Sequence, residues 1–510
     1  MKLRKIKSSA IALTLVVVFS KLIGMCRDVV LANYFGTSNI SDAYLTASTV
    51  PTLLFYFIGH ALSTAFLPMY NKVKNDQSKE SADQYANNLM TISLLLCTVF
   101  VLILVIIPSV VVRLFAPGFD VSTAALAASF IRISAVSLYA MTVISIWTGY
   151  LQSVSNFIIP AFISVPRNVM IMLSIVLAAK VHIMLLGVGI LLAYASEMVL
   201  LFPFVRRSGY RTRLRVDWQS PELKETLYVV LPILLGTSIG QINKIIDKSL
   251  ASTVTEGAVS AMSYASVINN AVQEVLVTSL ITILFANCSR WVAEGKHKEV
   301  KEKLLGTTST LVSILFPASV GVILLSRQVV VCMLARGSFD ETSVQMTTAA
   351  LCCYTVGLSF LALRDTFVKV FYAYKMTGIA TKTSIATIAI SIAMKFLLSK
   401  PLGIYGLALA TSFSAIIHCI TLYILLRKKI GALGTKKLLS IIVRVAIPTV
   451  FMAGGVLGTL YFTADAPEII RLVAGVGAGM VVYALFAFIF KIPLAQQVCS
   501  IIKKKNRNHE

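Results

Sequence analysis

Residues 88–112 read NLMTISLLLCTVFVLILVIIPSVVV, and this stretch is typical of a membrane-spanning helix. It contains no Asp, Glu, Lys or Arg, and most of its side chains are aliphatic. A helix that crosses the hydrocarbon core of a bilayer needs about 20 mostly apolar residues. The stretch is therefore long enough and apolar enough to cross a membrane.

Similar stretches recur throughout the 510 residues. The chain is 57% apolar and 13% charged, with a mean hydropathy of +0.84. An ordinary soluble domain has about 25% charged residues, so a soluble enzyme is excluded as the main body. The sequence predicts an all-α polytopic membrane protein with about 14 transmembrane helices, at 9–33, 42–68, 88–112, 124–150, 157–179, 182–205, 225–252, 258–286, 305–326, 343–373, 378–399, 403–426, 438–462 and 469–492.

The basic residues indicate an orientation for these spans. The chain has 46 Lys and Arg against 22 Asp and Glu, a net charge of +24. In the predicted loops, 29 Lys and Arg lie on one side and 6 on the other. Because short cytoplasmic loops carry the excess of Lys and Arg, we expect both termini in the cytoplasm. The charge then faces anionic lipid, and nucleic acid is not an expected partner.

A faint internal repeat suggests two related halves. At an offset of 219 residues, Asp28, Leu31, Ala32 and Ser41 fall on Asp247, Leu250, Ala251 and Ser260. Many transporters are built from repeated halves. We predict a six-helix lobe at 1–220, a second six-helix lobe at 221–430, and at 431–510 two final transmembrane helices with a basic cytoplasmic tail.

Charged side chains at bilayer depth are costly, so each is a candidate functional residue. The alternative is that they reach the headgroups or form buried structural pairs; we favour this for Arg167. For Lys21, Arg27 and Asp28 we favour a polar cavity, because three charges on one helix cannot all face hydrocarbon. The candidates form three groups, Ser20, Lys21, Arg27, Asp28 and Asp42, then Lys244, Asp247 and Lys248, then Arg364, Asp365 and Lys369, with Arg167, Glu197, Lys395 and His418 among the isolated ones.

Signatures of enzymes and cofactor sites are weak. Gly236 to Gly240 matches G-x-S-x-G, but this motif needs a strand-turn-helix context and here lies in an apolar stretch. The eight cysteines and five histidines show no metal-ligand spacing. We therefore expect a transporter rather than an enzyme, with no cofactor and no bound metal, coupled to the membrane potential or to a monovalent cation.

Several motifs resemble those of one transporter family. They are SKLIGMCRD at 20–28, YFG at 34–36, SDAY at 41–44, DKSLAS at 247–252, EGAVSA at 256–261 and GLALATS at 406–412. Together they resemble the MurJ/MviN family of lipid II flippases, over nearly the whole chain. The resemblance implies the multidrug/oligosaccharidyl-lipid/polysaccharide exporter fold. It also implies a multi-pass protein of the bacterial cytoplasmic membrane that moves lipid II, an undecaprenyl-pyrophosphate-linked sugar, to the outer leaflet for cell-wall synthesis.

The resemblance also implies which residues bind the cargo. Lys21 and Arg27 match the cavity cations of the family, and Ser20, Asp28 and Asp42 match their polar neighbours. The chain departs from the family at Phe55 and Val267, where many relatives have arginine. An exporter of the same fold for another undecaprenyl-linked glycan or a drug is therefore the alternative. Lys244 and Lys248 are our candidates for the replacement charge.

These residues suggest a mechanism. Lys21 and Arg27, with Lys244, are expected to bind the pyrophosphate from the cytoplasmic side, and the lobes then rock. The membrane potential can return a positive cavity, at roughly 2.3 kcal/mol per charge per 100 mV. We also hypothesise that Asp247 and Lys395 form a coupling site, with Lys395 in place of a bound cation. A membrane-embedded transferase is disfavoured, and a scaffold that recruits other cell-wall synthesis proteins would not need charges at depth.

Overall fold

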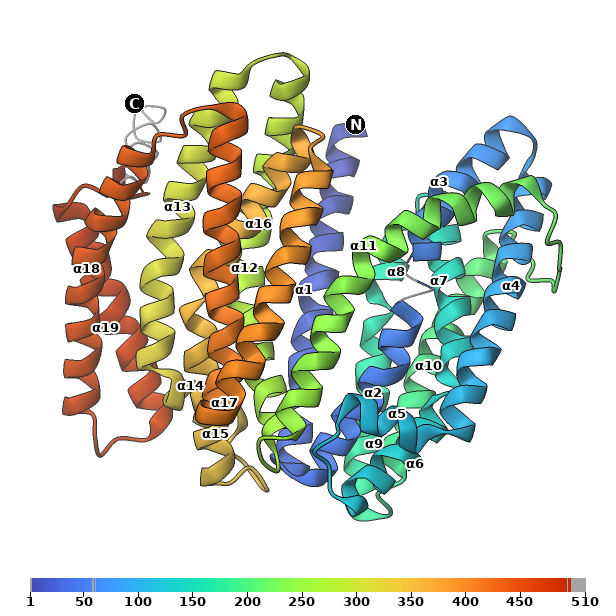
Figure 1. The fold of residues 1–510 in the computed structure, drawn as a ribbon, viewed down its shortest axis with the longest axis horizontal. Coiled ribbons are helices and arrows are strands. Elements are labelled where there is room, and N and C mark those ends of the chain that lie inside the picture. The colour runs from blue at the N-terminus through green and yellow to red at the C-terminus, as the bar shows by residue number, and fades with distance from the viewer. Residues whose placement is uncertain (1, 57–58, 60, 493, 497–510) are drawn as a thin grey trace. The chain divides into compact units, whose positions relative to one another are not determined.

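The computed structural model describes residues 2–56, 59, 61–492 and 494–496 (Figure 1). These residues form helices and no strand. The helices of the first half are α1 (Lys2–Phe35), α2 (Asn39–Phe55), α3 (Ala61–Asp76), α4 (Lys79–Ile106), α5 (Pro108–Phe115), α6 (Val121–Ser134), α7 (Ser137–Ser153), α8 (Ile158–Phe162), α9 (Ser164–Lys180), α10 (Leu185–Arg207) and α11 (Pro221–Ser252). Those of the second half are α12 (Ala258–Ala293), α13 (His297–Leu324), α14 (Ser326–Leu334), α15 (Glu341–Val356), α16 (Leu358–Ala373), α17 (Thr377–Ile430), α18 (Thr435–Phe462) and α19 (Glu468–Ile489).

The helices have the length and composition of membrane spans. Within the described residues, seven are long and apolar enough to cross a bilayer, or up to nine if each of two bent pairs forms one span. The bent pairs are α6 with α7, at 45°, and α15 with α16, at 43°. The all-α membrane fold is thus confirmed, and the number of 14 spans stays a prediction.

Two further breaks lie in the predicted spans or between them. The stretch 88–112 is divided, because α4 ends at Ile106 and α5 begins at Pro108, whose ring cannot donate a backbone hydrogen bond. Helix α17 contains a kink at Gly403, whose φ of 55° and ψ of −128° are not helical. The parts on either side, 377–402 and 404–430, correspond to the two spans predicted there.

The chain divides into two compact units. The N-terminal unit comprises Met1–Ser260 with Arg336–Phe339, and the C-terminal unit comprises Ala261–Ala335 and Asp340–Glu510. The units are defined by packing, and the predicted division at 220 and 430 stays a prediction. The basic residues predicted for the tail, Lys503, Lys504, Lys505 and Arg507, lie outside the described residues.

An aromatic core holds α3, α4, α7 and α10 together in the N-terminal unit. Tyr70, Tyr150 and Tyr210 are buried, with ring centroids of neighbouring pairs 5.7 and 4.7 Å apart. A buried tyrosine hydroxyl requires a hydrogen-bond partner. Tyr70 donates to Asp83 at 2.7 Å, and Tyr150 donates to the carbonyl of Ser208 at 2.8 Å. These bonds fix the helix ends that carry the loops.

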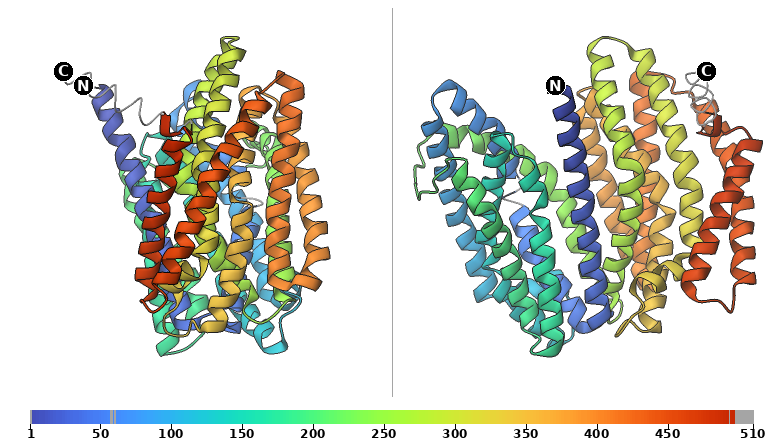
Figure 2. Two further views of the ribbon diagram at one scale, coloured as in Figure 1. Left: turned by 90° about the vertical axis from the view of Figure 1, so that its left-hand side faces the viewer. Right: turned by 180° about the vertical axis from the view of Figure 1, so that it is seen from behind.

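In the C-terminal unit, α18 and α19 form a pair of antiparallel helices that lie side by side (Figures 1 and 2). Phe451 and Phe486 stack with ring centroids 4.1 Å apart. A Cβ atom at Gly479 would lie 3.1 Å from Val456, so glycine allows the two helices to approach closely. This pair corresponds to the two final spans predicted from the sequence.

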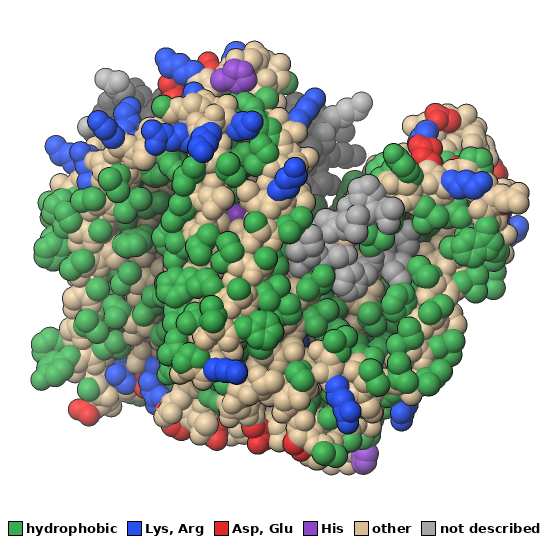
Figure 3. Space-filling view, viewed as in Figure 1, with side chains coloured by type: hydrophobic (Ala, Val, Ile, Leu, Met, Phe, Trp, Pro, Cys, Tyr) green, Lys and Arg blue, Asp and Glu red, His purple; other side chains and the backbone are tan. Residues whose placement is uncertain are grey.

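The surface of the C-terminal unit has the pattern of a membrane protein. In Figure 3, a broad band of hydrophobic side chains separates an end rich in Lys and Arg from an end where Asp and Glu gather. Exposed apolar side chains of α18 and α19 include Leu439, Val450, Val473 and Val481. Apolar side chains that would be unfavourable in water are suited to lipid.

Candidate functional site

The candidate site begins at two parallel helices, α1 and α9. The Ser20 hydroxyl donates to the Ala161 carbonyl at 3.3 Å, and Arg27 Nη1 donates to Asn168 Oδ1 at 3.2 Å. Both contacts join residues 141 apart, so α1 runs parallel to α8 and α9. The polar face that the sequence predicts on α1 therefore faces α9, where Asn168 is buried.

The Arg27 side chain is held on both edges. Its Nε and Nη2 donate to Asp28 Oδ1 at 3.0 and 2.7 Å, while Nη1 reaches Asn168. Asn168 in turn donates to the Ser164 carbonyl at 2.8 Å, which orients its amide oxygen toward Arg27. Asp28 is 8% exposed, and a buried charge of this kind is tolerated only when paired. Sequence-predicted Arg27 and Asp28 are thus brought together.

A second guanidinium, that of Arg167, lies on α9 one residue before Asn168. Arg167 Nη1 is 3.2 Å from Glu197 Oε1 on α10, and the guanidinium lies 5.7 Å from the ring centroid of Tyr194. Tyr194 contacts Thr52 of α2 through the two hydroxyls at 3.3 Å. We call these residues the arginine cluster: Arg27, Asp28, Arg167, Asn168, Tyr194 and Glu197.

Asp42, by contrast, is tied to the start of α12. Its two carboxylate oxygens accept the backbone N–H groups of Gly257 and Ser260 at 3.0 and 2.7 Å. The first N–H groups of a helix have no partner within the helix, so a carboxylate stabilises this end. Asp42 is 1% exposed. The structure gives it a helix-capping role, and its predicted role in cargo binding stays a prediction.

The second predicted group lies on α11. Lys248 Nζ donates to the Leu45 carbonyl at 2.6 Å and to the Thr49 hydroxyl at 2.5 Å, both on α2. Asn243 donates to Asp247 at 3.4 Å. Lys244, one residue further, is exposed. Lys248 thus holds α2 against α11, and Lys244 is the most exposed of the three charged residues.

Lys21 and Lys395 differ in burial. Lys21 is exposed on α1, six residues before Arg27. Lys395 is 0% exposed within α17 of the C-terminal unit. Asp247 belongs to the other unit, so the predicted coupling between Asp247 and Lys395 stays a prediction.

The third predicted group forms a smaller cluster in the C-terminal unit. Arg364 donates through Nε and Nη2 to Asp365 at 2.9 and 2.7 Å, and Gln273 donates to the other Asp365 oxygen at 3.1 Å. This repeats the Arg27 and Asp28 arrangement. Lys369 instead lies over the rings of Phe285 and Tyr372.

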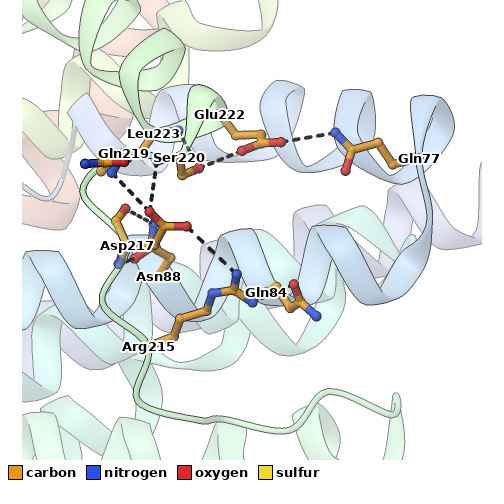
Figure 4. Close-up of polar contacts among 9 residues, drawn as sticks. All are labelled: Gln77, Gln84, Asn88, Arg215, Asp217, Gln219, Ser220, Glu222 and Leu223. Atoms are coloured by element: carbon orange, nitrogen blue, oxygen red, sulfur yellow. Dashed lines mark hydrogen bonds and ion pairs between the residues drawn. The ribbon is translucent and has the colours of Figure 1, made fainter.

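The basic loop between α10 and α11 is fixed to α4 (Figure 4). Asn88 donates to the Asp217 carbonyl at 2.8 Å and accepts the Asp217 N–H at 2.7 Å. At the start of α11, the Ser220 hydroxyl and the Gln77 amide donate to Glu222 and lower the pKa of its carboxyl below the usual range. The backbone of this loop therefore has hydrogen-bond partners on α4 just before α11 begins.

No group of three His, Cys, Asp or Glu side chains within the described part of the chain is arranged to hold a metal ion. The polar chemistry of the N-terminal unit consists of guanidinium, carboxylate, amide and hydroxyl groups. Such groups can bind an anion through charge-assisted hydrogen bonds.

Comparisons with known proteins identify the family. The model of the family described as "Lipid II flippase MurJ" matches residues 31–476. The chain belongs to the MurJ family. A probable lipid II flippase MurJ of Rickettsia prowazekii is 26% identical over 78% of this chain and 79% of its own length. One of Thermotoga maritima is 24% identical over 78% of this chain and 80% of its own length.

Solved structures show the same fold as this MurJ-family chain. A structure titled "Lipid II flippase MurJ, inward closed conformation" has a TM-score of 0.81 at 24% identity, covering 94% of this chain and 98% of its own. A multidrug resistance MATE family transporter of the MOP superfamily has a TM-score of 0.68 at 15% identity, covering 84% and 99%. The fold that the resemblance implies is confirmed. The family match does not favour the alternative of a drug or other glycan exporter.

Within this MurJ-family chain, sequence reasoning missed Asn168 and Tyr194. It named Arg167 and Glu197 as isolated charges and did not pair them, because the pairing depends on how α9 and α10 pack. One signal was present: Pro166, Arg167 and Asn168 interrupt an otherwise apolar span. Phe55, the position where many relatives have arginine, is one helical turn from Thr52. Thr52 contacts the arginine cluster through Tyr194.

Proposed function

We propose that this chain moves lipid II from the cytoplasmic to the outer leaflet of the bacterial cytoplasmic membrane by alternating access. The observation that carries this proposal is a half-buried guanidinium in a MurJ-family fold: Arg27, held by Asp28 and Asn168. Charged groups in membrane spans are retained where they bind something. The pyrophosphate of lipid II is the matching anion.

The cargo-binding residues in this proposal are Lys21 and Arg27. The arginine cluster contains two guanidinium groups and two carboxylates, so its charges balance, and Lys21 adds the net positive charge that attracts a diphosphate. Ser20 and Asp28 orient the cations, as their hydrogen bonds on α1 suggest. Lys244 extends the cationic surface along α11. Each of these roles follows from side-chain chemistry and placement.

The direction of transport follows from the proposed orientation. Both termini are placed in the cytoplasm because basic residues gather in the loops on that side. The membrane potential then favours return of the positively charged, cargo-free site. A coupling role for Asp247 and Lys395 would add a monovalent ion to this cycle. Recruitment of other cell-wall synthesis proteins through the basic loops is compatible with the same orientation.

A rescue experiment tests the proposed function. Cells depleted of their own lipid II flippase receive the wild-type chain or the variant with Lys21→Ala and Arg27→Ala, and lipid II on the cytoplasmic side is quantified. We expect the wild type to lower this pool and the variant to leave it high, with equal membrane insertion of both. A well-inserted wild type that leaves the pool unchanged would exclude lipid II as the cargo.

A further inference from the structure

The arginine cluster contains a second guanidinium, Arg167, that the proposed function does not use. It lies on α9, immediately before the Asn168 that binds Arg27. Its side chain is 32% exposed, whereas its partner Glu197 is 2% exposed. A charged side chain that is accessible while its carboxylate partner is buried can offer donors to a ligand on its open side.

The contacts of Arg167 leave most of its donors available. A guanidinium has five N–H donors in a planar fork. Its contact with Glu197 joins Nη1 to Oε1 at 3.2 Å, and that oxygen has no hydrogen-bond partner among the residues that the structure describes. The face of the fork lies over Tyr194. A ring on the face and a carboxylate at one corner fix the direction of the fork while its remaining edge stays open.

Each of the two guanidinium groups is therefore oriented by a carboxylate and by one further side chain. Arg27 is oriented by Asp28 on one edge and Asn168 on the other, and Arg167 is oriented by Glu197 and Tyr194. Successive residues of a helix point about 100° apart, so Asn168 and Arg167 face neighbouring sides of α9. Helix α9 joins the two, because Arg167 lies over the Tyr194 ring while the next residue, Asn168, binds Arg27.

We propose that Arg167 is a second substrate-binding residue, which contacts one phosphoryl group of the diphosphate while Arg27 contacts the other. Glu197 is its positioning residue. This inference rests on the proposed function and extends it to specificity: two guanidinium groups match two phosphoryl groups, so the site distinguishes a diphosphate-linked lipid from a monophosphate lipid. Arginine suits this role because its planar fork matches phosphate oxygens bidentately.

The test compares two lipids. Binding of lipid II and of undecaprenyl monophosphate is measured with the full chain in nanodiscs. The main variant carries Arg167→Leu with Glu197→Leu, because replacing both partners avoids leaving a buried carboxylate alone. We expect its affinity for lipid II to fall about 10- to 100-fold, the loss of charge-assisted hydrogen bonds. Its affinity for the monophosphate is expected to change by less than about 3-fold.

Two further variants separate binding from structure. Arg167→Lys keeps a cation opposite Glu197 and so protects the fold, but it lacks the fork, and we expect an intermediate loss of preference for lipid II. Arg132→Leu is the matched control, an exposed arginine of the same unit that donates to the Val105 carbonyl, and we expect it to bind both lipids like the wild type.

The outcomes distinguish this inference from the proposed function. A double variant that keeps the wild-type preference for lipid II, or that loses both lipids equally, would overturn the role of Arg167 while leaving lipid II as the cargo. A folded wild type that does not bind lipid II would overturn the proposed function, and the assignment of Arg167 with it.

Discussion

Asp28 and Asp42 are two buried carboxylates of the N-terminal unit. The sequence predicts the same role for both, as polar neighbours of the cavity cations, but their partners in the structure differ. Asp28 pairs with the Arg27 guanidinium, and Asp42 accepts two backbone N–H groups at the start of α12. When a carboxylate pairs with a cationic side chain, that side chain can leave the carboxylate and bind a ligand. One that caps a helix cannot leave without exposing the helix end. Their contributions to binding and to stability should therefore separate.

We predict that Asp42→Ala destabilises the protein without altering the cargo site. Two buried N–H groups lose their acceptor, so the free energy of unfolding should fall by about 1–3 kcal/mol. Thermal unfolding in detergent measures the loss, with Asp76→Asn, at the exposed end of α3, as the control. Weaker lipid II binding at unchanged stability would instead assign Asp42 to the cargo site.

Asn168 should act on the cargo through Arg27. In Asn168→Leu, the Nη1 group loses its acceptor and Arg27 is oriented by Asp28 alone, so we predict about 2- to 10-fold weaker binding of lipid II, the value of one hydrogen bond. Titration of lipid II in nanodiscs measures this. Asn156→Ala, which removes a hydrogen bond to the Ile159 N–H outside the cluster, should bind normally. Equal binding by both variants would show that Asn168 does not position Arg27.

The sequence located the membrane-spanning helices better than it located the breaks and bends within them. The apolar runs located the spans on either side of Gly403, and the final pair α18 and α19, because length and apolarity alone specify a membrane helix. The same runs could not locate the break at Pro108 or the 43° bend between α15 and α16. Those depend on which backbone groups find partners once the helices pack.

The kink in α17 should depend on its glycine. At Gly403, φ is 55° and ψ is −128°, a conformation that residues with a Cβ atom rarely adopt. We predict that Gly403→Ala lowers the free energy of unfolding by about 1–3 kcal/mol. Gly458→Ala in α18 is the control, because a Cβ atom there meets nothing within 4 Å. If thermal unfolding shows the same midpoint for both variants, the kink does not require glycine.

The start of α6 should be sensitive to acid. Asp120 caps this helix by accepting the N–H groups of Ser122 and Thr123, and these residues lower the pKa of its carboxyl from 3.8 to about 2. A lowered pKa means that the ionised form stabilises the fold above about pH 4 and that this stabilisation is lost as the pH falls toward 2. Compared with Asp120→Asn, the wild type should therefore unfold at a higher temperature at pH 6, and this difference should shrink below pH 4. A constant difference would contradict the prediction.

For the chain as a whole, composition and motifs were enough to predict a multi-pass MurJ-family fold, and the cargo-binding roles of Arg27 and Asp28 stay predictions. Composition and motifs could not pair Arg167 with Glu197, since these residues lie on different helices whose contact is a property of the packed unit. Lys248 shows the same limit: its hydrogen bonds to α2 could not be predicted from the sequence, and its role as a replacement charge for the cargo stays a prediction. Charged residues within apolar stretches can be found from the sequence, whereas their partners on other helices cannot.

The most direct test is translocation by the purified chain. Lipid II carrying a fluorescent group on its peptide is placed in vesicles containing the wild-type chain or Arg27→Ala, and the appearance of the headgroup on the opposite face is followed with time. We predict translocation by the wild type and a rate at least about 10-fold lower for the variant, because the diphosphate loses a charge-assisted contact. Translocation at the wild-type rate by Arg27→Ala, or none by a folded wild type, would contradict the account.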